Sequence, residues 1–270
     1  MVQIMGIVNL NGDSFYAPSR VEGPQALGRI RRMAADGADI IDIGAVSTRP
    51  GAAPVSLEEE WKRLSPVLQA LSKTEIPFYA PSALPRFSID TVRAEIVRRS
   101  YETIGPLIVN DISAGEDDPG MLLTVGGLGL PYIAMHKRGT PETMDTLTDY
   151  SWASDGQGSG VVEAVLQYFQ DFGEAAAEAG VRNWILDPGF GFAKTRSQNL
   201  ELLSHLNLFR RFGKPVLAAL ADKRFTIVRR TGRNRTEELH AQAVRHGADM
   251  LRVHDVAAAR KTLQTLHADE

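Results

Sequence analysis

Short apolar runs alternate with amphipathic segments along this chain. Each run is typical of a strand buried on both faces, and each segment after it repeats its apolar residues at helical spacing. The pattern predicts eight strands, at residues 3–8, 38–43, 87–90, 107–111, 129–136, 184–187, 215–220 and 247–253. A helix is expected after every strand.

Residues with capping chemistry mark where several of these helices begin. Ser56 with Glu59, and Thr195 with Gln198, form the pattern in which side chains bond the free amides of a first helical turn. Asp118 followed by Pro119 predicts a cap and a first helical residue. Glycine ends several helices, a position that favours the left-handed conformation. These glycines are Gly37, Gly129, Gly180, Gly213 and Gly247. The helices are expected at residues 23–35, 56–71, 92–101, from 119 onward, and at 162–179, 199–212, 231–246 and 256–266.

Eight alternations of strand and helix in a chain of 270 residues predict an α/β protein with a single (β/α)8 TIM barrel. An open, doubly wound sheet is the competing arrangement for the same alternation. Uniform right-handed crossovers through eight strands favour the closed barrel. No linker, long repeat or low-complexity run divides the chain, so we expect one domain over residues 1–270.

The composition is that of an ordinary globular protein and excludes several classes of function. The net charge is −3, which gives no basic field for nucleic acid or for an anionic membrane. No apolar stretch approaches the roughly 20 residues needed to cross a bilayer. Cys is absent, which excludes disulfides, thiolate metal sites and a cysteine nucleophile. The first residues, MVQIMGIVNL, carry no charged leader, and we expect a cytoplasmic protein.

Polar residues stand at the carboxyl ends of nearly all the predicted strands. In a (β/α)8 barrel these ends meet on one face, which carries the active site. Taken singly, each residue has a local interpretation: Asp187 in Asp-Pro-Gly could shape a turn, and Asp90 or Asp111 could cap a helix. A whole set at equivalent positions is hard to explain by capping. The set comprises Asn9, Asp90, Asn110, His136, Asp187, Lys223, Arg252 and His254, with Arg49 on the loop after the second strand.

This set divides by charge into two groups. One suits a polyanion such as a diphosphate, because guanidinium forks bind phosphate oxygens bidentately and an asparagine can hold a metal ion or a phosphate oxygen. Its members are Arg49, Arg252, His254, Asn9 and Thr48. The other suits a neutral polar heterocycle, because a buried carboxylate accepts parallel hydrogen bonds from an amide N–H and an adjacent amine. Its members are Asp90, Asn110, Asp187 and Lys223.

Seven segments carry a family resemblance. They read MGIVNLNGDSF at residues 5–15, IIDIGAVSTRPG at 40–51, SIDT at 88–91, VNDISAG at 109–115, MHKRGTP at 135–141, LDPGFGFAKT at 186–195 and LRVHDV at 251–256. In this order they resemble the dihydropteroate synthase family of pterin-binding barrels. The segments cover nearly the whole chain, so the resemblance is far more specific than any single glycine motif.

The resemblance implies a transferase of folate biosynthesis. A 6-hydroxymethyl-dihydropterin diphosphate binds in the barrel mouth, diphosphate leaves with the help of Mg²⁺, and the amine of 4-aminobenzoate attacks the resulting pterin methyl cation. Catalysis of this kind depends on stabilising the leaving group more than on acid–base chemistry. The resemblance also implies a homodimer that pairs its late helices.

The same resemblance assigns roles to individual residues. The expected catalytic residues are Asn9, Asp13, Arg49, Lys223, Arg252 and His254, with Asn9 as the metal ligand. The pterin is held by Asp90, Asn110, Asp187 and Lys223, with Met135 and Arg252 beside its ring. The diphosphate is held by Asn9, Thr48, Arg49, Arg252 and His254, and Phe190 lines the aminobenzoate site.

Three departures from the family pattern leave other functions open. Asn11-Gly12 replaces Thr-Pro in the first loop, Ala193 replaces a glycine, and Ala221-Asp222 replaces Ser-Arg. One alternative is a paralogue that keeps the pterin pocket but has lost the aminobenzoate side. Another is a relative that transfers a methyl group from a methylated folate, which would leave the cationic group of residues without an anion.

The Ala221-Asp222 pair generates a testable prediction. In the family the Ser-Arg pair lies beside the carboxylate of 4-aminobenzoate, and here a hydroxyl is lost and a cation becomes an anion. At close range this repulsion is about 1–4 kcal/mol for an effective dielectric of roughly 20–80. We expect a raised KM for 4-aminobenzoate, which Ala221→Ser with Asp222→Arg should lower in steady-state kinetics. Tight binding by the unchanged chain, with no gain from the double change, would contradict the prediction.

Overall fold

The computed structural model describes residues 1–10, 23–47, 53–73, 86–140, 142–154, 156, 158–221 and 235–268. Each predicted strand has a counterpart within these ranges, shifted by a few residues at its ends. The strands are β1 Gln3–Asn9, β2 Ile40–Gly44, β3 Arg86–Asp90, β4 Ile108–Asp111, β5 Tyr132–Met135, β6 Trp184–Asp187, β7 Leu217–Ala218 and β8 Met250–Val253.

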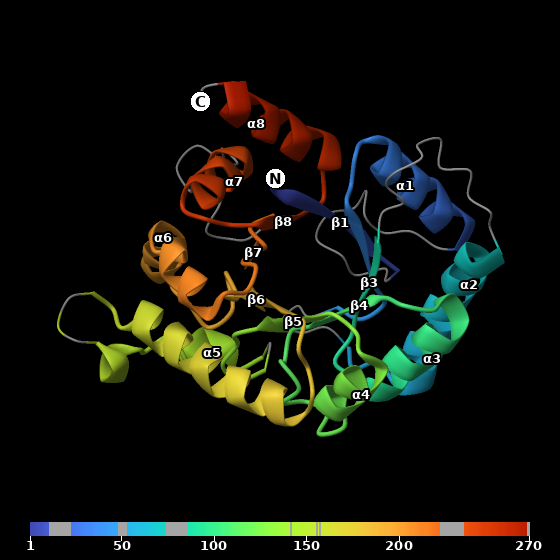
Figure 1. Ribbon diagram of the computed structural model, residues 1–270, viewed down its shortest axis with the longest axis horizontal. Helices are drawn as coiled ribbons and strands as arrows, with labels where there is room; N and C mark the ends of the chain where they lie inside the picture. Colours follow the sequence, from blue (N-terminus) through green and yellow to red (C-terminus); the bar gives the residue numbers. More distant parts are fainter. Residues whose placement is uncertain are drawn as a thin grey trace.

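The helices form an outer ring around the strands (Figure 1). They are α1 Gly23–Ala35, α2 Leu57–Lys73, α3 Ala94–Ile104, α4 Met121–Leu128, α5 Val161–Glu178, α6 Arg196–Ser204, α7 Thr236–Arg245 and α8 Val256–Ala268. Short 3-10 turns, Met144–Thr146 and Ser151–Ala153, interrupt the long connection before α5, and a third, Leu206–Phe212, follows α6. None of the helices in the described ranges is both long and apolar enough to span a membrane.

All eight strands are parallel and join into one sheet. Their order is β6-β5-β4-β3-β2-β1-β8-β7, so the first strand lies beside the last. Gln3 to Gly6 of β1 pair with Met250 to Val253 of β8. A parallel bridge between Leu186 and Val216 connects the two remaining edges, β6 and β7. The (β/α)8 prediction is confirmed, and the open doubly wound alternative is wrong.

The barrel interior changes from apolar to polar along the strands. Gly6 faces the helices, because a Cβ there would touch Met33 of α1 and Val256 of α8, so its neighbour Met5 faces inward. Met5 belongs to a buried apolar layer with Ile40, Ile108, Ile133, Ile185, Leu217 and Met250. Side chains alternate between the faces of a strand, so residues two positions further on share the interior. They include Asp42, Asn110, Asp187 and Arg252.

The local signals for helix ends had mixed outcomes. The capping box at α6 is confirmed, because Gln198 N–H donates to Thr195 Oγ1 at 3.3 Å and Thr195 N–H donates to Gln198 Oε1 at 2.8 Å. The junction glycines are confirmed as left-handed, with φ between 61° and 104°. The prediction for Asp118-Pro119 was right in part. Pro119 is not the first helical residue, because α4 begins at Met121. Asp118 Oδ1 nevertheless accepts from the N–H of Gly120 at 2.9 Å, while its Oδ2 accepts from the N–H of Ala94, the first residue of α3, at 2.8 Å.

Two adjacent glycines in α4 give a test of the packing. A Cβ on Gly126 would lie 1.9 Å from the carbonyl oxygen of Ala179, whereas a Cβ on Gly127 would meet nothing within 4 Å. Gly126→Ala should therefore lower the free energy of unfolding by about 1–3 kcal/mol, as overpacking does. Gly127→Ala should be neutral or stabilising by up to about 1 kcal/mol, because alanine favours a helix. Urea unfolding of both variants is the measurement, and equal effects would contradict the packing.

Candidate active site

The carboxyl ends of the strands bring the described site residues to one face of the barrel. Each lies at or next to the end of β1, β3, β4, β5, β6 or β8. These residues are Asn9, Asp90, Asn110, Met135, Asp187, Arg252 and His254. The other predicted residues of the mouth, Asp13, Thr48, Arg49 and Lys223, lie outside the described residues, as do Asn11, Gly12 and Asp222.

A buried carboxylate that the sequence analysis did not single out lies at the centre of this face. Asp42 of β2 is 0% exposed. Its Oδ2 accepts a hydrogen bond from Asn110 Nδ2 at 3.0 Å and another from Arg252 Nε at 2.8 Å. The Arg252 Nη2 atom lies 2.6 Å from the same oxygen. One oxygen of Asp42 thus ties β2 to β4 and to β8.

Arg252 also reaches a second carboxylate. Its Nη2 donates to Asp90 Oδ2 at 2.6 Å, and the two side chains are 19% and 18% exposed. Burial raises the pKa of Asp90 to about 7 against the opposing effect of Arg252, and the Asp42 carboxylate adds to the rise. Burial opposes the charge on Arg252, but Asp42 and Asp90 outweigh it and raise the pKa of the guanidinium. Two carboxylates therefore share one fixed cation.

A glycine gives Asp90 its space. Gly44 ends β2, and the strand register places it opposite Asn9 on one side and Asp90 on the other. A Cβ on Gly44 would lie 3.2 Å from Asp90 Cβ and 3.5 Å from its Oδ2. Any larger residue would press on the carboxylate, so the glycine keeps the mouth open beside it.

Asp187 and Phe190 lie in and just after β6. Asp187 Oδ1 accepts from the N–H of Gly189 at 2.8 Å, so the turn interpretation is confirmed for this oxygen. The register pairs Asp187 with Met135 of β5, which brings these two predicted site residues side by side. Phe190 is 1% exposed and belongs to the main core cluster. Its ring is therefore fixed by packing.

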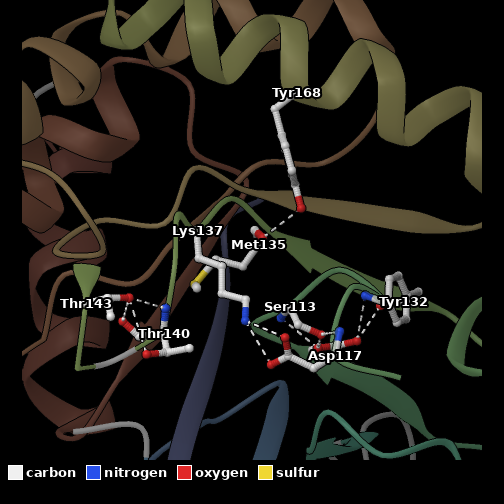
Figure 2. Close-up of polar contacts among 10 residues, drawn as sticks. Ser113, Asp117, Tyr132, Met135, Lys137, Thr140, Thr143 and Tyr168 are labelled. Atoms are coloured by element: carbon white, nitrogen blue, oxygen red, sulfur yellow. Dashed lines mark hydrogen bonds and ion pairs between the residues drawn. The ribbon is translucent and has the colours of Figure 1, made fainter. Parts of the chain in front are cut away.

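The neighbour of Asn110 has a structural role. Asp111 accepts from the N–H and the Oγ of Ser113, both at 2.7 Å, from Gly115 N–H at 2.9 Å and from Tyr132 Oη at 2.6 Å. Figure 2 labels two of these donors, Ser113 and Tyr132. Burial raises the pKa of Asp111, although the bonds from Tyr132 and Ser113 favour its charged form. These four bonds fix the loop after β4, and Asp111 acts as a turn-former.

His136 lies on the helix side of the sheet. Its ring meets Tyr168 of α5 edge-on with the centroids 4.9 Å apart, and its Nδ1 lies 2.9 Å from Lys194 Nζ. Burial lowers the pKa of His136 well below its usual value, and the Lys194 ammonium adds to this. His136 is therefore neutral and lies outside the cluster formed by Asp42, Asp90 and Arg252.

Polar contacts connect the segments that follow β2 to β6, from the first turn of α2 to the loop after β6. Figure 2 shows one of them, in which the nearly buried Lys137 bonds both carboxylate oxygens of Asp117 at 2.7 and 2.8 Å. We name the series the loop belt. Its contacts are Thr91 to Glu60, Ala94 N–H to Asp118, Lys137 to Asp117 and Lys194 to His136. The belt holds one side of the mouth in a fixed shape.

The described part of the chain offers few donors for a metal ion. Among the described residues no group of three or more His, Asp or Glu side chains could hold a metal ion. Asn9 offers a carboxamide oxygen at the end of β1. Such a single protein ligand fits Mg²⁺, which commonly takes its remaining ligands from water and from a substrate's phosphates.

The sequence contained a signal for Asp42. It was overlooked because Asp42 lies inside its strand, whereas site residues were expected at the strand ends. Asp42 interrupts an otherwise apolar strand, Ile40-Ile-Asp-Ile-Gly44. An acid inside a strand buried on both faces needs a partner, because an unpaired buried charge is very costly. The sequence does not show that Asn110 and Arg252 pair with it, since both are far away in the chain.

Comparison with known proteins decides the family. The family model of the pterin binding enzymes matches residues 5–254 of this chain. This chain belongs to the pterin binding enzyme family. A dihydropteroate synthase of Synechocystis is 38% identical over 265 residues, which is 94% of this chain and 86% of the relative.

Solved structures of pterin binding enzymes share the fold. The dihydropteroate synthase of Yersinia pestis, in a complex with a sulfonamide drug, has a TM-score of 0.86 at 31% identity and covers 99% of this chain and 94% of its own. That of Xanthomonas albilineans, with 4-aminobenzoic acid, has a TM-score of 0.81 at 35% identity and covers 99% and 93%. The likeness extends over the whole barrel of both proteins.

The two carboxylates on Arg252 should differ in their effect on stability. Asp42→Asn removes a fully buried charge, so we expect a loss of about 1.5–3 kcal/mol, the scale of a hydrogen bond to a charged group. Asp90→Asn should cost under about 1 kcal/mol, because its partly exposed ion pair is screened by water. Urea unfolding at neutral pH compares the two variants. Equal losses, or no loss from Asp42→Asn, would contradict the conclusion that Asp42 holds Asn110 and Arg252 in place.

Proposed function

We propose that this chain catalyses the dihydropteroate synthase reaction. It joins 6-hydroxymethyl-7,8-dihydropterin diphosphate to 4-aminobenzoate and releases diphosphate. The observation that carries the proposal is the cluster of Asp42, Asn110, Arg252 and Asp90 at the carboxyl end of the barrel. This cluster combines hydrogen-bond acceptors and a fixed cation in the place where such barrels carry their active sites. Relatives that carry out this synthesis match the chain over most of its length.

The pterin ring fits the polar interior of the mouth. Its amide N–H and adjacent amine would donate to a carboxylate, and Asp90 and Asp187 offer one each on β3 and β6. Asn110 donates its amide N–H to Asp42, which leaves its carbonyl oxygen to accept from the ring. Lys223 would donate to a ring acceptor, with Met135 and Arg252 flanking the ring.

The diphosphate would bind at the cationic side of the mouth. Asp42 and Asp90 already neutralise much of the charge of Arg252, so the anion needs further positive groups. His254 follows β8 directly, and Asn9 ends β1, the strand that pairs with β8. Thr48, Arg49 and Asp13 would complete this side. Mg²⁺ held through Asn9 would supply positive charge to the diphosphate oxygens.

The chemistry needs little from general acids or bases. The bond between the pterin methylene carbon and the diphosphate oxygen breaks, and its electron pair leaves with the diphosphate. The lone pair of the aminobenzoate nitrogen forms the new C–N bond, and that nitrogen then loses one proton. The residues of the mouth hold the ring, screen the charge on the carbon and stabilise the leaving group, which preorganised groups do without reorganising.

We propose in addition that the protein acts as a cytoplasmic homodimer that pairs its late helices. The family resemblance supports this assembly, which would use α7 and α8. Sedimentation equilibrium tests it, because a dimer has twice the mass of the 29.5 kDa chain. A monomer at micromolar concentration would contradict it.

The reaction itself is tested by measuring diphosphate release from the pterin diphosphate, with Mg²⁺, in the presence and absence of 4-aminobenzoate. We expect release that depends on 4-aminobenzoate and yields dihydropteroate in equal amount. Binding of the pterin diphosphate without release would favour the binding paralogue. Dependence on a methylated folate would favour methyl transfer.

The raised pKa of Asp90 predicts how pterin affinity varies with pH. Its pKa is about 7, so below neutral pH the carboxyl takes up a proton and loses an acceptor for the ring. The affinity for 6-hydroxymethyl-dihydropterin should fall by up to about tenfold per pH unit below this pKa. Asp90→Asn should bind more weakly and without this dependence. Calorimetry at pH 6 to 8 compares the two proteins, and since the ligand's own titration is common to both, parallel profiles would contradict the role of Asp90.

A further inference from the structure

A buried lysine holds the loop after β6. Lys194 is 8% exposed, and its Nζ donates to His136 Nδ1 at 2.9 Å and to the carbonyl oxygens of Gly189 and Phe192, both at 3.0 Å. An ammonium has three N–H donors, so these three neutral acceptors can occupy all of them. A lysine is rarely buried so deeply, because its charge must leave water. The three bonds of Lys194 therefore offset the cost of burying its charge, and they hold the loop together.

The loop that Lys194 holds has an unfavourable backbone conformation. Gly189, Gly191 and Ala193 have positive φ angles of 72°, 79° and 49°. Ala193 stands where the family usually has glycine, and a residue with a Cβ is strained in this region. Such a conformation persists only when the surroundings fix it. Asn199 contributes by accepting from Gly191 N–H at 2.7 Å, and Lys194 contributes from inside the loop.

The contacts of Lys194 act on Phe190 more than on Asp187. The two carbonyl oxygens belong to Gly189 and Phe192, which lie on either side of Phe190. Asp187 is held independently, because its carbonyl oxygen accepts from the N–H of His136 at 3.0 Å within the sheet. Loss of the ammonium would therefore free the Phe190 segment while the strand and its carboxylate stay in place.

We infer that Lys194 is a positioning residue that fixes the Phe190 segment as a wall of the second-substrate site, with His136 as its anchor on β5. The inference rests on the proposed function, in which Phe190 lines the site of 4-aminobenzoate. A neutral imidazole is what the anchor requires, because Nδ1 must accept from the ammonium and the ring proton then lies on Nε2. The burial of His136 among Tyr168, Tyr150 and Lys194 keeps the ring in that form.

The first experiment replaces Lys194 by methionine, which keeps the length of the side chain and removes its donors. Lys194→Met should raise the KM for 4-aminobenzoate at least tenfold, with the KM for the pterin diphosphate within twofold of the unchanged chain and kcat within about threefold. A residue that merely stabilised the fold would lower the active fraction and move neither KM. An unchanged KM for 4-aminobenzoate, or equal changes in both constants, would overturn the inference.

The anchor is tested by a matched pair of substitutions. His136→Leu removes the acceptor and should raise the KM for 4-aminobenzoate, whereas His136→Asn supplies an amide oxygen near the Nδ1 position and should restore it. If Lys194→Met does not fold, this pair decides alone, and equal constants for the two variants overturn the inference. Lys214→Met is the control, because Lys214 also bonds a carbonyl oxygen, that of Arg182, and lies before β7 at the opposite end of the barrel.

Hydrogen exchange separates this inference from the proposed function. The amides of Gly189 and Gly191 donate to the side chains of Asp187 in β6 and Asn199 in α6. They should exchange at least tenfold faster in Lys194→Met, with the amides of β5 and β6 unchanged. This readout needs no substrate. If the unchanged chain shows no diphosphate release that depends on 4-aminobenzoate, the proposed function fails while the exchange still decides whether Lys194 fixes the loop. Unchanged exchange overturns the positioning role.

Discussion

The contact between Asp42 and Arg252 is the constraint on which the mouth of the barrel depends. A carboxylate at 0% exposure is tolerable only with a charged or hydrogen-bonded partner, and the guanidinium of Arg252 provides one. The same guanidinium reaches Asp90, and the same oxygen of Asp42 holds Asn110. Side chains from four strands thus take fixed positions before any substrate arrives, which limits the reorganisation left to binding.

The loop belt extends this fixed geometry from the strands to the loops. Its contacts run from the first turn of α2 to the loop after β6, and several of them bury a charged or polar side chain. Buried polar contacts of this kind stabilise one arrangement over others only when every partner is present. The ring-binding side of the mouth is therefore rigid, as the electrostatic stabilisation of a leaving group requires.

Much of this architecture could be predicted from the sequence, because its signals are local. The strand and helix periods, the capping box at Thr195 and the junction glycines each depend on residues a few positions apart. The structure confirms them, except that the helix expected at residues 199–212 is α6, which ends at Ser204, followed by a 3-10 segment. The pairings of Asp42 with Arg252 and of Lys194 with His136 escaped prediction because the partners lie 210 and 58 residues apart in the chain. The local bond of Asp118 to Gly120 N–H could be predicted, but its second bond, to Ala94 of α3, could not. A strand-end rule identifies which side chains face the mouth but not which of them hold one another.

The most direct test of this account is a pair of crystal structures, one of the free protein and one with the pterin diphosphate bound. We expect the ring to contact Asp90, Asn110 and Asp187, and the distance from Asp42 Oδ2 to Arg252 Nε to stay near 2.8 Å in both structures. A ring bound elsewhere, or an Arg252 that leaves Asp42 in either structure, would contradict the claim that the buried ion pair preforms the pterin site.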